Sequence, residues 1–363
     1  MNKVKLFVDC HVFDGNYQGT TTYLKGIYSE LIKNRNIHFY FASYDTEALS
    51  KIFGYQDNIT YIKYATKNKF LRLLFEIPKL ISKNKIQYAH FQYVVPPLKK
   101  CKYILTIHDV LFLDFPQYFP LTYRLKNKFL FFVSAKLSDI IFSVSDYSAE
   151  RIKKHFNLKE ILVTKNAVDE VFLQEFNKVE TSKRVKEKFS IENYFLFVSR
   201  IEPRKNHLGL LKVFVEKKYY QDYELVFVGN NAIRYEEFEN YFESLDDSIK
   251  MKIKILNNIE FNDLVEITRA AKLSIYPSFA EGFGIPPLES VACGIPTVSS
   301  NTTAMNDFYF IKEFLFNPYS MDDFNSKILK ALHDPKEENI LSEMKKSYDW
   351  GKSAEVFYKR ISK

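Results

Sequence analysis

The sequence has little cysteine, glycine or proline, and it lacks a long uninterrupted apolar run. Its three cysteines stand far apart, with neither a Cys-x-x-Cys pair nor zinc-site spacing, so we expect a reducing cytosol and no structural metal. The 10 glycines and 12 prolines are dispersed, which argues against a long flexible linker. Lys136 and Asp139 interrupt the most apolar tract, residues 129–144, which therefore does not predict a membrane span.

The amino-terminal residues lack the apolar core of a signal peptide, so we expect a cytoplasmic protein. The net charge of +8 would suit nucleic acid, an anionic bilayer or phosphorylated small molecules. The sequence shows no helix-turn-helix signal, no zinc-finger spacing and no aromatic-basic strand pattern of an RNA-binding sheet. We therefore expect no nucleic-acid partner.

Apolar strand-like runs alternate with segments of helical periodicity, which predicts parallel sheets covered by helices on both faces. With 363 residues, 46% of them hydrophobic, the chain is long enough for two cores. The expected strands are residues 4–10, 37–43, 88–93, 103–108, 140–145 and 161–164, then 194–199, 224–228, 253–256, 273–276 and 297–299. Because the alternation starts afresh near residue 190, we predict an α/β chain with two Rossmann-like domains.

A polar stretch, residues 177–188, is the expected domain boundary. We therefore predict an N-terminal domain over residues 1–176 and a C-terminal domain over residues 177–344. Residues 345–363 are expected to form a helix that packs back on the first domain. Open parallel sheets place ligands beyond the carboxyl ends of their strands, so two facing sheets would put the chemistry in an interdomain cleft.

The most specific segment, residues 278–294, directly follows an expected strand. Gly282 and Gly284 suit a tight turn where backbone approaches a ligand. Two successive prolines then fit the first turn of a helix, and Gly294 fits its end. This pattern predicts a helix of about two turns, roughly 12 Å long.

Because neither proline carries an N–H group, an anion at this helix start would be held by backbone amides before the prolines. The candidate amides are those of Gly282, Phe283, Gly284 and Ile285. Glu281 precedes the helix and Glu289 lies within it, with seven residues between them. The two carboxylates could grip hydroxyls on two parts of one sugar nucleotide; the plain alternative is a solvated helix glutamate beside a simple glycine turn.

A basic pair follows the expected strand at residues 194–199. Arg200 and Lys205 lie between the end of that strand and the next helix, so they would face the expected cleft. A guanidinium with a nearby ammonium fits a diphosphate leaving group. The alternative is that Arg200 and Lys205 are simply solvated side chains on a loop. The presence of the carboxylate pair in the same half of the chain favours a shared binding site instead.

Together these segments resemble glycosyltransferase family four, whose signature is Glu-x7-Glu. Glu281 and Glu289 match the two glutamates, and Arg200 and Lys205 resemble the family's paired basic residues. The likeness extends over nearly the whole chain, since residues 106–109 and 143–151 resemble the family's first domain. It implies the GT-B type of fold, with two facing Rossmann domains, and sugar transfer with retention of anomeric configuration.

The resemblance also implies a role for each matching residue. Arg200 and Lys205 would bind the donor diphosphate, Glu281 the donor-sugar hydroxyls and Glu289 the ribose. The turn amides would contact the phosphate or sugar. Members usually need no metal, and this chain contains no Asp-x-Asp motif, so we expect a nucleotide-sugar co-substrate without a metal or other cofactor.

Two matches in the first half concern His108 and Gly19. His108 ends an expected strand, where a family histidine lies beside the donor sugar and helps position the reacting groups; a structural hydrogen-bonding role is the alternative. Asp109 is expected to serve a turn or a helix cap. Many relatives have Gly-x-Gly-Arg before the first helix, whereas Gly19 here is followed by three threonines, whose hydroxyls could replace the missing donors or cap the helix.

Residues 67–85 form a basic amphipathic stretch. It could lie on an anionic membrane and meet a lipid-linked acceptor, or it could simply be a helix that packs against the sheet. By resemblance we expect the protein to transfer a hexose to a glycan or lipid-linked oligosaccharide in surface polysaccharide synthesis. Our first choice of donor is GDP-mannose, which would supply mannose. We expect the reaction to take place at the inner face of the cell membrane. The segment with His108, Asp109 and Val110, followed by Phe115 and Pro116, resembles that of family relatives that often use GDP-mannose, and this resemblance implies the donor. A sugar-nucleotide epimerase and a non-catalytic sugar-nucleotide-binding protein are the alternative functions.

Overall fold

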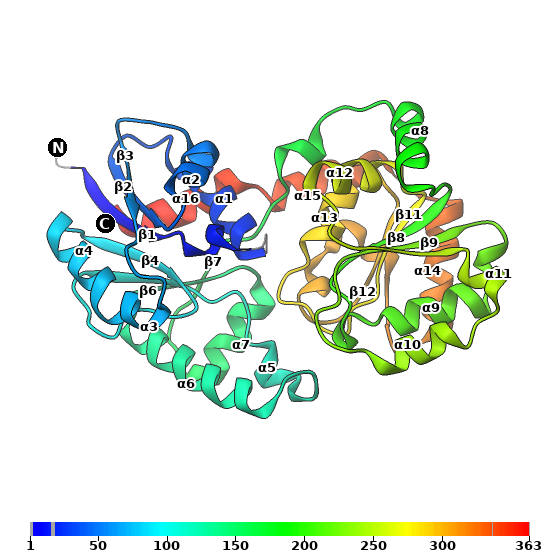
Figure 1. Ribbon diagram of the computed structural model, residues 1–363, viewed down its shortest axis with the longest axis horizontal. Coiled ribbons are helices and arrows are strands. Elements are labelled where there is room, and N and C mark those ends of the chain that lie inside the picture. The colour runs from blue at the N-terminus through cyan, green and yellow to red at the C-terminus, as the bar shows by residue number, and fades with distance from the viewer. Residues whose placement is uncertain (1–2, 16–18, 336, 363) are drawn as a thin grey trace. The chain divides into compact units, whose positions relative to one another are not determined.

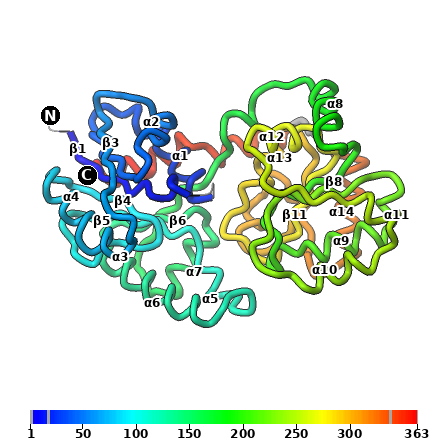
Figure 2. The backbone as a smooth tube through the Cα atoms, viewed as in Figure 1, coloured from blue at the N-terminus to red at the C-terminus, as the bar shows by residue number. Residues whose placement is uncertain are grey.

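The computed structural model describes residues 3–15, 19–335 and 337–362, which form two compact α/β units (Figure 1). Unit 1 comprises residues 1–167 with 348–363, and unit 2 comprises residues 168–347. Figure 2 follows the same chain as a tube, with the carboxyl-terminal residues returning to unit 1. Each unit contains one parallel sheet with helices packed against it, which confirms the predicted fold class.

Unit 1 is built on a seven-stranded sheet of order β3-β2-β1-β4-β5-β6-β7, in which every neighbouring pair is parallel. Its strands are β1 (Val4–Asp9), β2 (Ile37–Ser43), β3 (Ile59–Lys63), β4 (Tyr88–Gln92), β5 (Lys102–Thr106), β6 (Ile140–Ser143) and β7 (Leu162–Val163). Its helices before the carboxyl terminus are α1 (Gly19–Leu31), α2 (Thr46–Phe53), α3 (Lys69–Leu71), α4 (Ile77–Asn84), α5 (Leu111–Asp114), α6 (Leu121–Leu137) and α7 (Asp146–Phe156). The sequence did not predict β3, an edge strand whose side chains are partly exposed and therefore carry little apolar signal.

Unit 2 is built on a six-stranded parallel sheet of order β10-β9-β8-β11-β12-β13. Its strands are β8 (Tyr194–Val198), β9 (Glu224–Val228), β10 (Ile253–Leu256), β11 (Leu273–Tyr276), β12 (Thr297–Ser300) and β13 (Leu315–Phe316). Its helices are α8 (Lys178–Phe189), α9 (His207–Glu216), α10 (Glu236–Glu243), α11 (Asp247–Lys250), α12 (Phe261–Ala270), α13 (Ile285–Ala292), α14 (Met321–His333) and α15 (Glu337–Ser347). The five strands predicted here are all present, while the two-residue β13 is too short to give a sequence signal.

The polar stretch expected as a boundary is the helix α8 instead. Asn177 caps it by accepting hydrogen bonds from the backbone amides of Val179 and Glu180, and lysine, arginine and glutamate are good helix formers. The helix packs on α12, where Arg184 pairs with Glu266. A polar composition therefore marked a surface helix.

The units divide after Ala167, nine residues before the expected boundary at 176. The short helix η4 (Glu170–Leu173) contacts α13, and the Arg269 guanidinium donates a 2.6 Å hydrogen bond to the Val171 carbonyl. These contacts hold residues 168–176 in unit 2.

The carboxyl-terminal helix α16 (Trp350–Ile361) belongs to unit 1 and lies against α1. Phe357 is fully buried and stacks on Phe142, with ring centroids 4.9 Å apart. The Ser353 hydroxyl donates a 2.7 Å hydrogen bond to the Lys165 carbonyl. The helix that returns to unit 1 thus begins at Trp350, while the residues up to Ser347 stay in unit 2.

Gly26 of α1 provides the space into which Trp350 packs. A Cβ atom on Gly26 would lie 2.1 Å from the Trp350 ring, which is closer than any side-chain contact tolerates. We expect Gly26→Ala to push α16 off α1 at a cost of about 1–3 kcal/mol or more. Because Trp350 is the single tryptophan, its fluorescence should shift to the red and the thermal midpoint should fall. Gly15→Ala, at a position with no neighbouring atom within 4 Å, is the matched control, and equal behaviour of both variants would contradict this packing.

Candidate functional site

The candidate site in unit 2 is formed by two loops that follow adjacent parallel strands. β8 and β11 pair directly, so the segments after Val198 and Tyr276 leave the same edge of the sheet. Asn206 ties these loops together, because its side-chain amide donates to the Pro277 carbonyl over 3.1 Å. The backbone amide of Phe279 also donates to the carbonyl of Arg204 over 2.9 Å.

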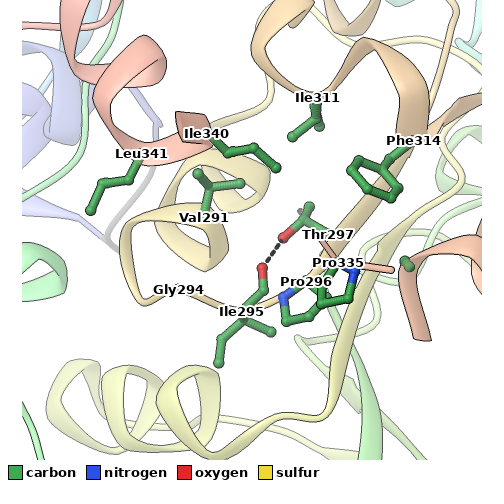
Figure 3. Close-up of a pocket in the computed structure, with 11 residues that line it drawn as sticks. Val291, Gly294, Ile295, Pro296, Thr297, Ile311, Phe314, Pro335, Ile340 and Leu341 are labelled. Atoms are coloured by element: carbon green, nitrogen blue, oxygen red, sulfur yellow. Dashed lines mark hydrogen bonds between the residues drawn. The ribbon is translucent and has the colours of Figure 1, made fainter. Parts of the chain in front are cut away.

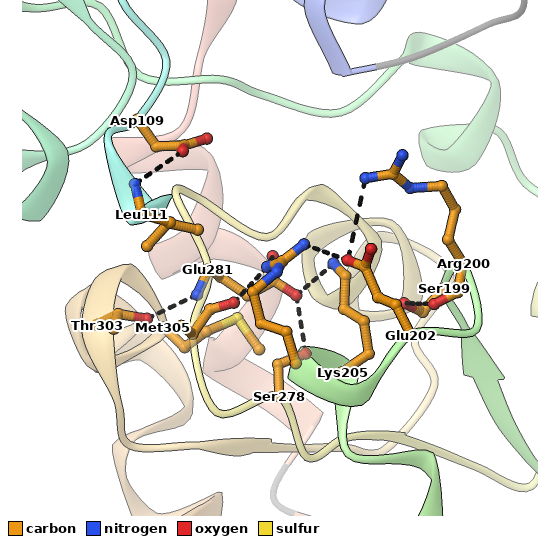
Figure 4. Close-up of polar contacts among 12 residues, drawn as sticks. Asp109, Leu111, Ser199, Arg200, Glu202, Lys205, Ser278, Glu281, Thr303 and Met305 are labelled. Atoms are coloured by element: carbon orange, nitrogen blue, oxygen red, sulfur yellow. Dashed lines mark hydrogen bonds and ion pairs between the residues drawn. The ribbon is translucent and has the colours of Figure 1, made fainter. Parts of the chain in front are cut away.

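Lys205 and Glu281 contact each other at this edge (Figure 4). The Lys205 Nζ atom lies 2.6 Å from Glu281 Oε1, and the Ser278 hydroxyl donates to the same oxygen over 2.8 Å. Only 15% of the Lys205 side chain and 12% of the Glu281 side chain are exposed. The two residues predicted to share a pocket therefore form a largely buried ion pair.

The surroundings keep Glu281 ionised. Burial by itself would raise the pKa of this carboxyl group, but Lys205 and Arg204, with hydrogen bonds from Lys205 and Ser278, outweigh burial and lower the pKa to about 2. Burial lowers the pKa of Lys205, an effect that Glu281 opposes and Arg204 reinforces. The site thus holds a fixed carboxylate that can accept hydrogen bonds from hydroxyl groups.

Arg204 and Glu202 complete the charged cluster, and sequence reasoning missed both. Arg204 bridges the two carboxylates, 2.5 Å from Glu202 Oε1 and 3.2 Å from Glu281 Oε2, and it also donates to the Ala280 carbonyl. Two cations and two carboxylates balance here. The sequence feature that could have identified them is the mixture of positive and negative residues immediately before Lys205.

Arg200 stands at the rim of this cluster. Its side chain is 65% exposed, and its guanidinium lies 3.9 Å from the Glu202 carboxylate (Figure 4). It adds one positive charge to a cluster that is otherwise balanced. Arg200 is therefore the cation best placed to meet an incoming anion.

The loop after β12 holds the Glu281 segment in place. The Glu281 amide donates to the Thr303 hydroxyl over 2.8 Å, and the hydroxyls of Ser300 and Thr302 donate to the Ser278 carbonyl over 2.7 and 3.1 Å. Thr303 adopts a left-handed conformation with a φ of 52°. Sequence reasoning missed these bracing residues, although a run of serines and threonines at a strand end marks such a loop.

The turn predicted at the start of α13 is present. Gly284 adopts a φ of 96°, which favours glycine, and α13 starts at Ile285 with prolines in its first turn. Phe283 is 6% exposed and packs edge-on to Phe308, with ring centroids 6.0 Å apart. Gly282 is likewise buried. Gly282 and Phe283 are thus buried, while Gly284 and Ile285 are partly exposed at the start of α13.

Glu289 lies on α13 in a different environment from Glu281. It is half-buried, and burial, with a smaller effect from Asp169, raises its pKa to about 8. None of the cations around Glu281 contributes to this shift. The structure therefore brings Glu281, Lys205 and Arg200 into one cluster and leaves Glu289 outside its ion pairs.

This raised pKa predicts a pH-dependent stability difference between the protein and Glu289→Gln. A group that holds its proton more tightly when folded favours folding below its unfolded pKa of about 4.5, and this advantage is lost as pH rises through about 8. Glutamine stays neutral throughout. We expect similar thermal midpoints near the lower pH and a higher midpoint for Glu289→Gln near the upper one. Parallel melting curves across this range would contradict the assignment, and Glu236→Gln on the surface serves as control.

His108 lies in unit 1, two residues beyond the end of β5 rather than within the strand as predicted. It is 7% exposed, and its Nε2 lies 2.7 Å from Gln92 Oε1. Because an amide oxygen only accepts, Nε2 carries the proton and Nδ1 keeps its lone pair. Burial lowers the pKa of His108 to about 3, and the Tyr23 ring lies edge-on, 5.1 Å away. His108 is thus a neutral imidazole with a defined tautomer.

Two neighbouring predictions concern Asp109 and Gly19. The Leu111 amide donates to the Asp109 carboxylate over 3.1 Å, which confirms the predicted turn role (Figure 4). Gly19 is the exposed first residue of α1, with no atom near its missing Cβ. Thr21 and Thr22 lie buried within α1 and therefore do not cap it; the Thr21 hydroxyl donates to the Val12 carbonyl over 3.3 Å.

A separate small pocket of about 110 Å³ lies in unit 2 (Figure 3). Val291, Ile295, Phe314 and Leu341 are among the residues that line it. No charged side chain contributes to this lining, so the pocket offers no counter-charge to a phosphate. The charged cluster around Glu281 remains the candidate site.

Two family models match the chain. Glycosyl transferases group 1 matches residues 178–348, and Glycosyltransferase Family 4 matches residues 17–172. The candidate cluster, Glu289 and the α13 turn fall in the first match, and His108 falls in the second.

Similar curated proteins include the O-antigen chain mannosyltransferase B of Escherichia coli, 29% identical over 64% of this chain. The O-antigen chain mannosyltransferase RfbU of Salmonella typhimurium is 28% identical over 62% of this chain. The matches span 61% and 59% of these relatives, which is less than two thirds of their length. A glycosyltransferase structure from Rickettsia africae shares the fold, with a TM-score of 0.73 at 17% identity and full coverage of both chains (100% of each).

Proposed function

Because the chain belongs to the glycosyltransferases of family four, we propose that it transfers a hexose from a nucleotide-sugar donor with retention of configuration. The observation that carries this proposal is the convergence of Lys205 and Glu281 at the carboxyl ends of β8 and β11. A buried carboxylate fixed by cations there suits sugar hydroxyls, and an exposed Arg200 suits the attached diphosphate.

Each charged residue then has a distinct role in the proposed reaction. Arg200 binds the donor diphosphate, and Lys205, which uses one of its three N–H donors on Glu281, directs its others toward the departing phosphate. Glu281 accepts hydrogen bonds from the donor sugar. Glu289, outside the ion pairs, binds the ribose. The amides of residues 282–285 meet the phosphate or the sugar.

We propose front-face attack as the mechanism. The acceptor hydroxyl attacks the anomeric carbon as the bond to the diphosphate breaks, and the leaving phosphate oxygen takes the hydroxyl proton. Arg200 and Lys205 stabilise the charge that develops on the diphosphate, with no metal required. An inverted anomeric configuration in the product would rule this mechanism out, and loss of turnover in EDTA would rule out metal independence.

For the donor we propose GDP-mannose, since the curated relatives reported above are named as mannosyltransferases. For the acceptor we propose a glycan or lipid-linked oligosaccharide of a surface polysaccharide, such as the O-antigen chains in those names. The protein would work on the cytoplasmic side, in peripheral contact with an anionic membrane. Within the described residues, none of the helices has the length and apolarity needed to cross a bilayer.

The deciding experiment offers the protein a panel of GDP- and UDP-sugars, with and without a lipid-linked acceptor. Transfer that requires both GDP-mannose and acceptor supports the proposal. Conversion of the donor alone would identify an epimerase, and binding without either reaction would identify a sugar-nucleotide-binding protein. A UDP-sugar as the preferred donor would overturn the GDP-mannose assignment and leave the transferase proposal in place.

A further inference from the structure

Helix α6 of unit 1 carries a row of exposed apolar side chains. Leu121, Leu125, Phe129 and Phe132 are 59%, 61%, 67% and 42% exposed. Their spacing of four, four and three residues places them on one face of the helix. Phe131, Ser134 and Ala135 of the same helix are buried. Since both faces are apolar, the sequence pattern of this helix gave no sign of an unpaired stripe.

The charges on α6 are all positive. Arg124, Lys126, Lys128 and Lys136 are interspersed with the apolar row, and the helix contains no aspartate or glutamate. The Lys136 ammonium lies 5.6 Å from the centre of the Phe132 ring, so the cation sits beside the exposed stripe. An apolar face flanked by lysines of one sign suits an interface between hydrocarbon and anionic headgroups.

A second exposed apolar group lies on α3 and the π-helical turn η2 (Arg72–Glu76) that continues it. Phe70, Leu71, Leu74 and Phe75 are 66%, 48%, 36% and 63% exposed. The intervening Leu73 is buried in the same hydrophobic core as Phe131 of α6, so both segments cover one part of the unit. Leu73 therefore packs into the core, as one of the two alternatives for residues 67–85 predicted, while the four residues named above remain exposed.

The two groups are neighbours on the surface of unit 1. Leu73 of η2 and Phe131 of α6 belong to one buried core cluster, so the exposed side chains beside them lie over the same core. α3 and α6 lie along the same edge of unit 1 in Figure 1. We call the exposed apolar side chains of α3, η2 and α6, together with the basic residues of these segments, the α3–α6 surface.

We propose that the α3–α6 surface docks the protein on an anionic lipid bilayer, with the α6 stripe inserted at the headgroup level. This inference rests on the proposed function in that a lipid-linked acceptor must be reached at a membrane. Charge decides between a bilayer and a second copy of the chain: in a two-fold self-association like-charged lysines would face one another, whereas anionic headgroups neutralise them. The docking site therefore extends well beyond the residues 67–85 expected from sequence.

The test measures flotation of the full-length protein with vesicles of phosphatidylglycerol and phosphatidylethanolamine, against vesicles of phosphatidylcholine alone. We expect binding to the anionic vesicles that weakens at high salt. The double variant Leu125→Ser, Phe129→Ser should bind about tenfold more weakly or worse, and Phe70→Ser, Phe75→Ser should also weaken binding. Val179→Ser, Met251→Ser, at positions 80% and 67% exposed in unit 2, is the matched control and should bind like the unaltered protein.

Equal thermal midpoints will show that these surface variants fold. Wild-type binding by the Leu125→Ser, Phe129→Ser variant, or a failure of the unaltered protein to bind anionic vesicles, overturns the proposal. A concentration-dependent dimer in sedimentation velocity that the same variant abolishes, without vesicle binding, would identify a second copy as the occupant. Transfer to a detergent-dispersed acceptor should be unchanged in the variants, so loss of docking and failure of the proposed reaction are read separately.

Discussion

Replacement of Lys205 by alanine is expected to lower the turnover number about 10²–10³-fold, the usual effect of removing one preorganised electrostatic group from a reacting site. Lys205 lies 2.6 Å from Glu281 and is largely buried, so no solvent cation can take its position easily. Arg204 remains beside Glu281 in the variant, and the carboxylate keeps a partner. The measurement is the rate of sugar transfer under donor saturation, together with the thermal midpoint.

Glu281→Gln is expected to lower the turnover number by a similar factor, because it removes the negative partner of the same ion pair. It leaves Arg204 and Lys205 with Glu202 as their only carboxylate in the cluster, and an unbalanced buried charge costs roughly 3–5 kcal/mol in stability. We therefore expect a lower thermal midpoint for Glu281→Gln than for Lys205→Ala. Lys217→Ala, which breaks an exposed pair with Asp322, is the control and should be active. Full turnover in both site variants would remove this cluster from the reaction.

The sequence allowed the strands that position the site to be predicted, because buried parallel strands are short, continuous and apolar. Residues 194–198 and 273–276 both have this character, and the functional loops follow them directly. The turn at Gly284 was predictable for the same local reason, since a positive φ favours glycine. Local rules were therefore sufficient for where the chain turns and where the chemistry gathers.

Partnerships across the chain were not predictable from local patterns. Arg204 and Glu281 are 77 positions apart in sequence, and only the pairing of β8 with β11 brings them together. Sequence reasoning placed Lys205 at the donor diphosphate, and the structure adds that its ammonium group pairs with the Glu281 carboxylate. The docking stripe of α6 was likewise hidden, because exposure of one apolar face depends on what packs against the other.

The contact between Gln92 and His108 is another partnership that local sequence patterns did not reveal. It also makes the role of His108 testable. Gln92 ends β4, in a buried position that the sequence marks only as part of a strand, and its amide oxygen fixes the proton of His108 on Nε2. The lone pair on Nδ1 can then accept a hydrogen bond from a reacting group at any ordinary pH, since the pKa of His108 is about 3. We expect His108→Ala to lower turnover by about 10²-fold or more, and wild-type turnover to show no acid limb from this residue.

Gln92→Glu tests this arrangement with a single charge. A carboxylate hydrogen-bonded to Nε2 favours the imidazolium form, so it raises the pKa of His108 toward or above its ordinary value of about 6.5. As the pH falls through that raised pKa, Nδ1 becomes protonated and loses its lone pair, and turnover should fall with it. Gln92→Leu removes the hydrogen bond without adding charge and should lower turnover without creating an acid limb. If the pH–rate profile of Gln92→Glu matched that of the unaltered protein while both variants kept its thermal midpoint, His108 would have a structural role only, because a group that positions reacting atoms cannot change its protonation state without changing their reaction rate.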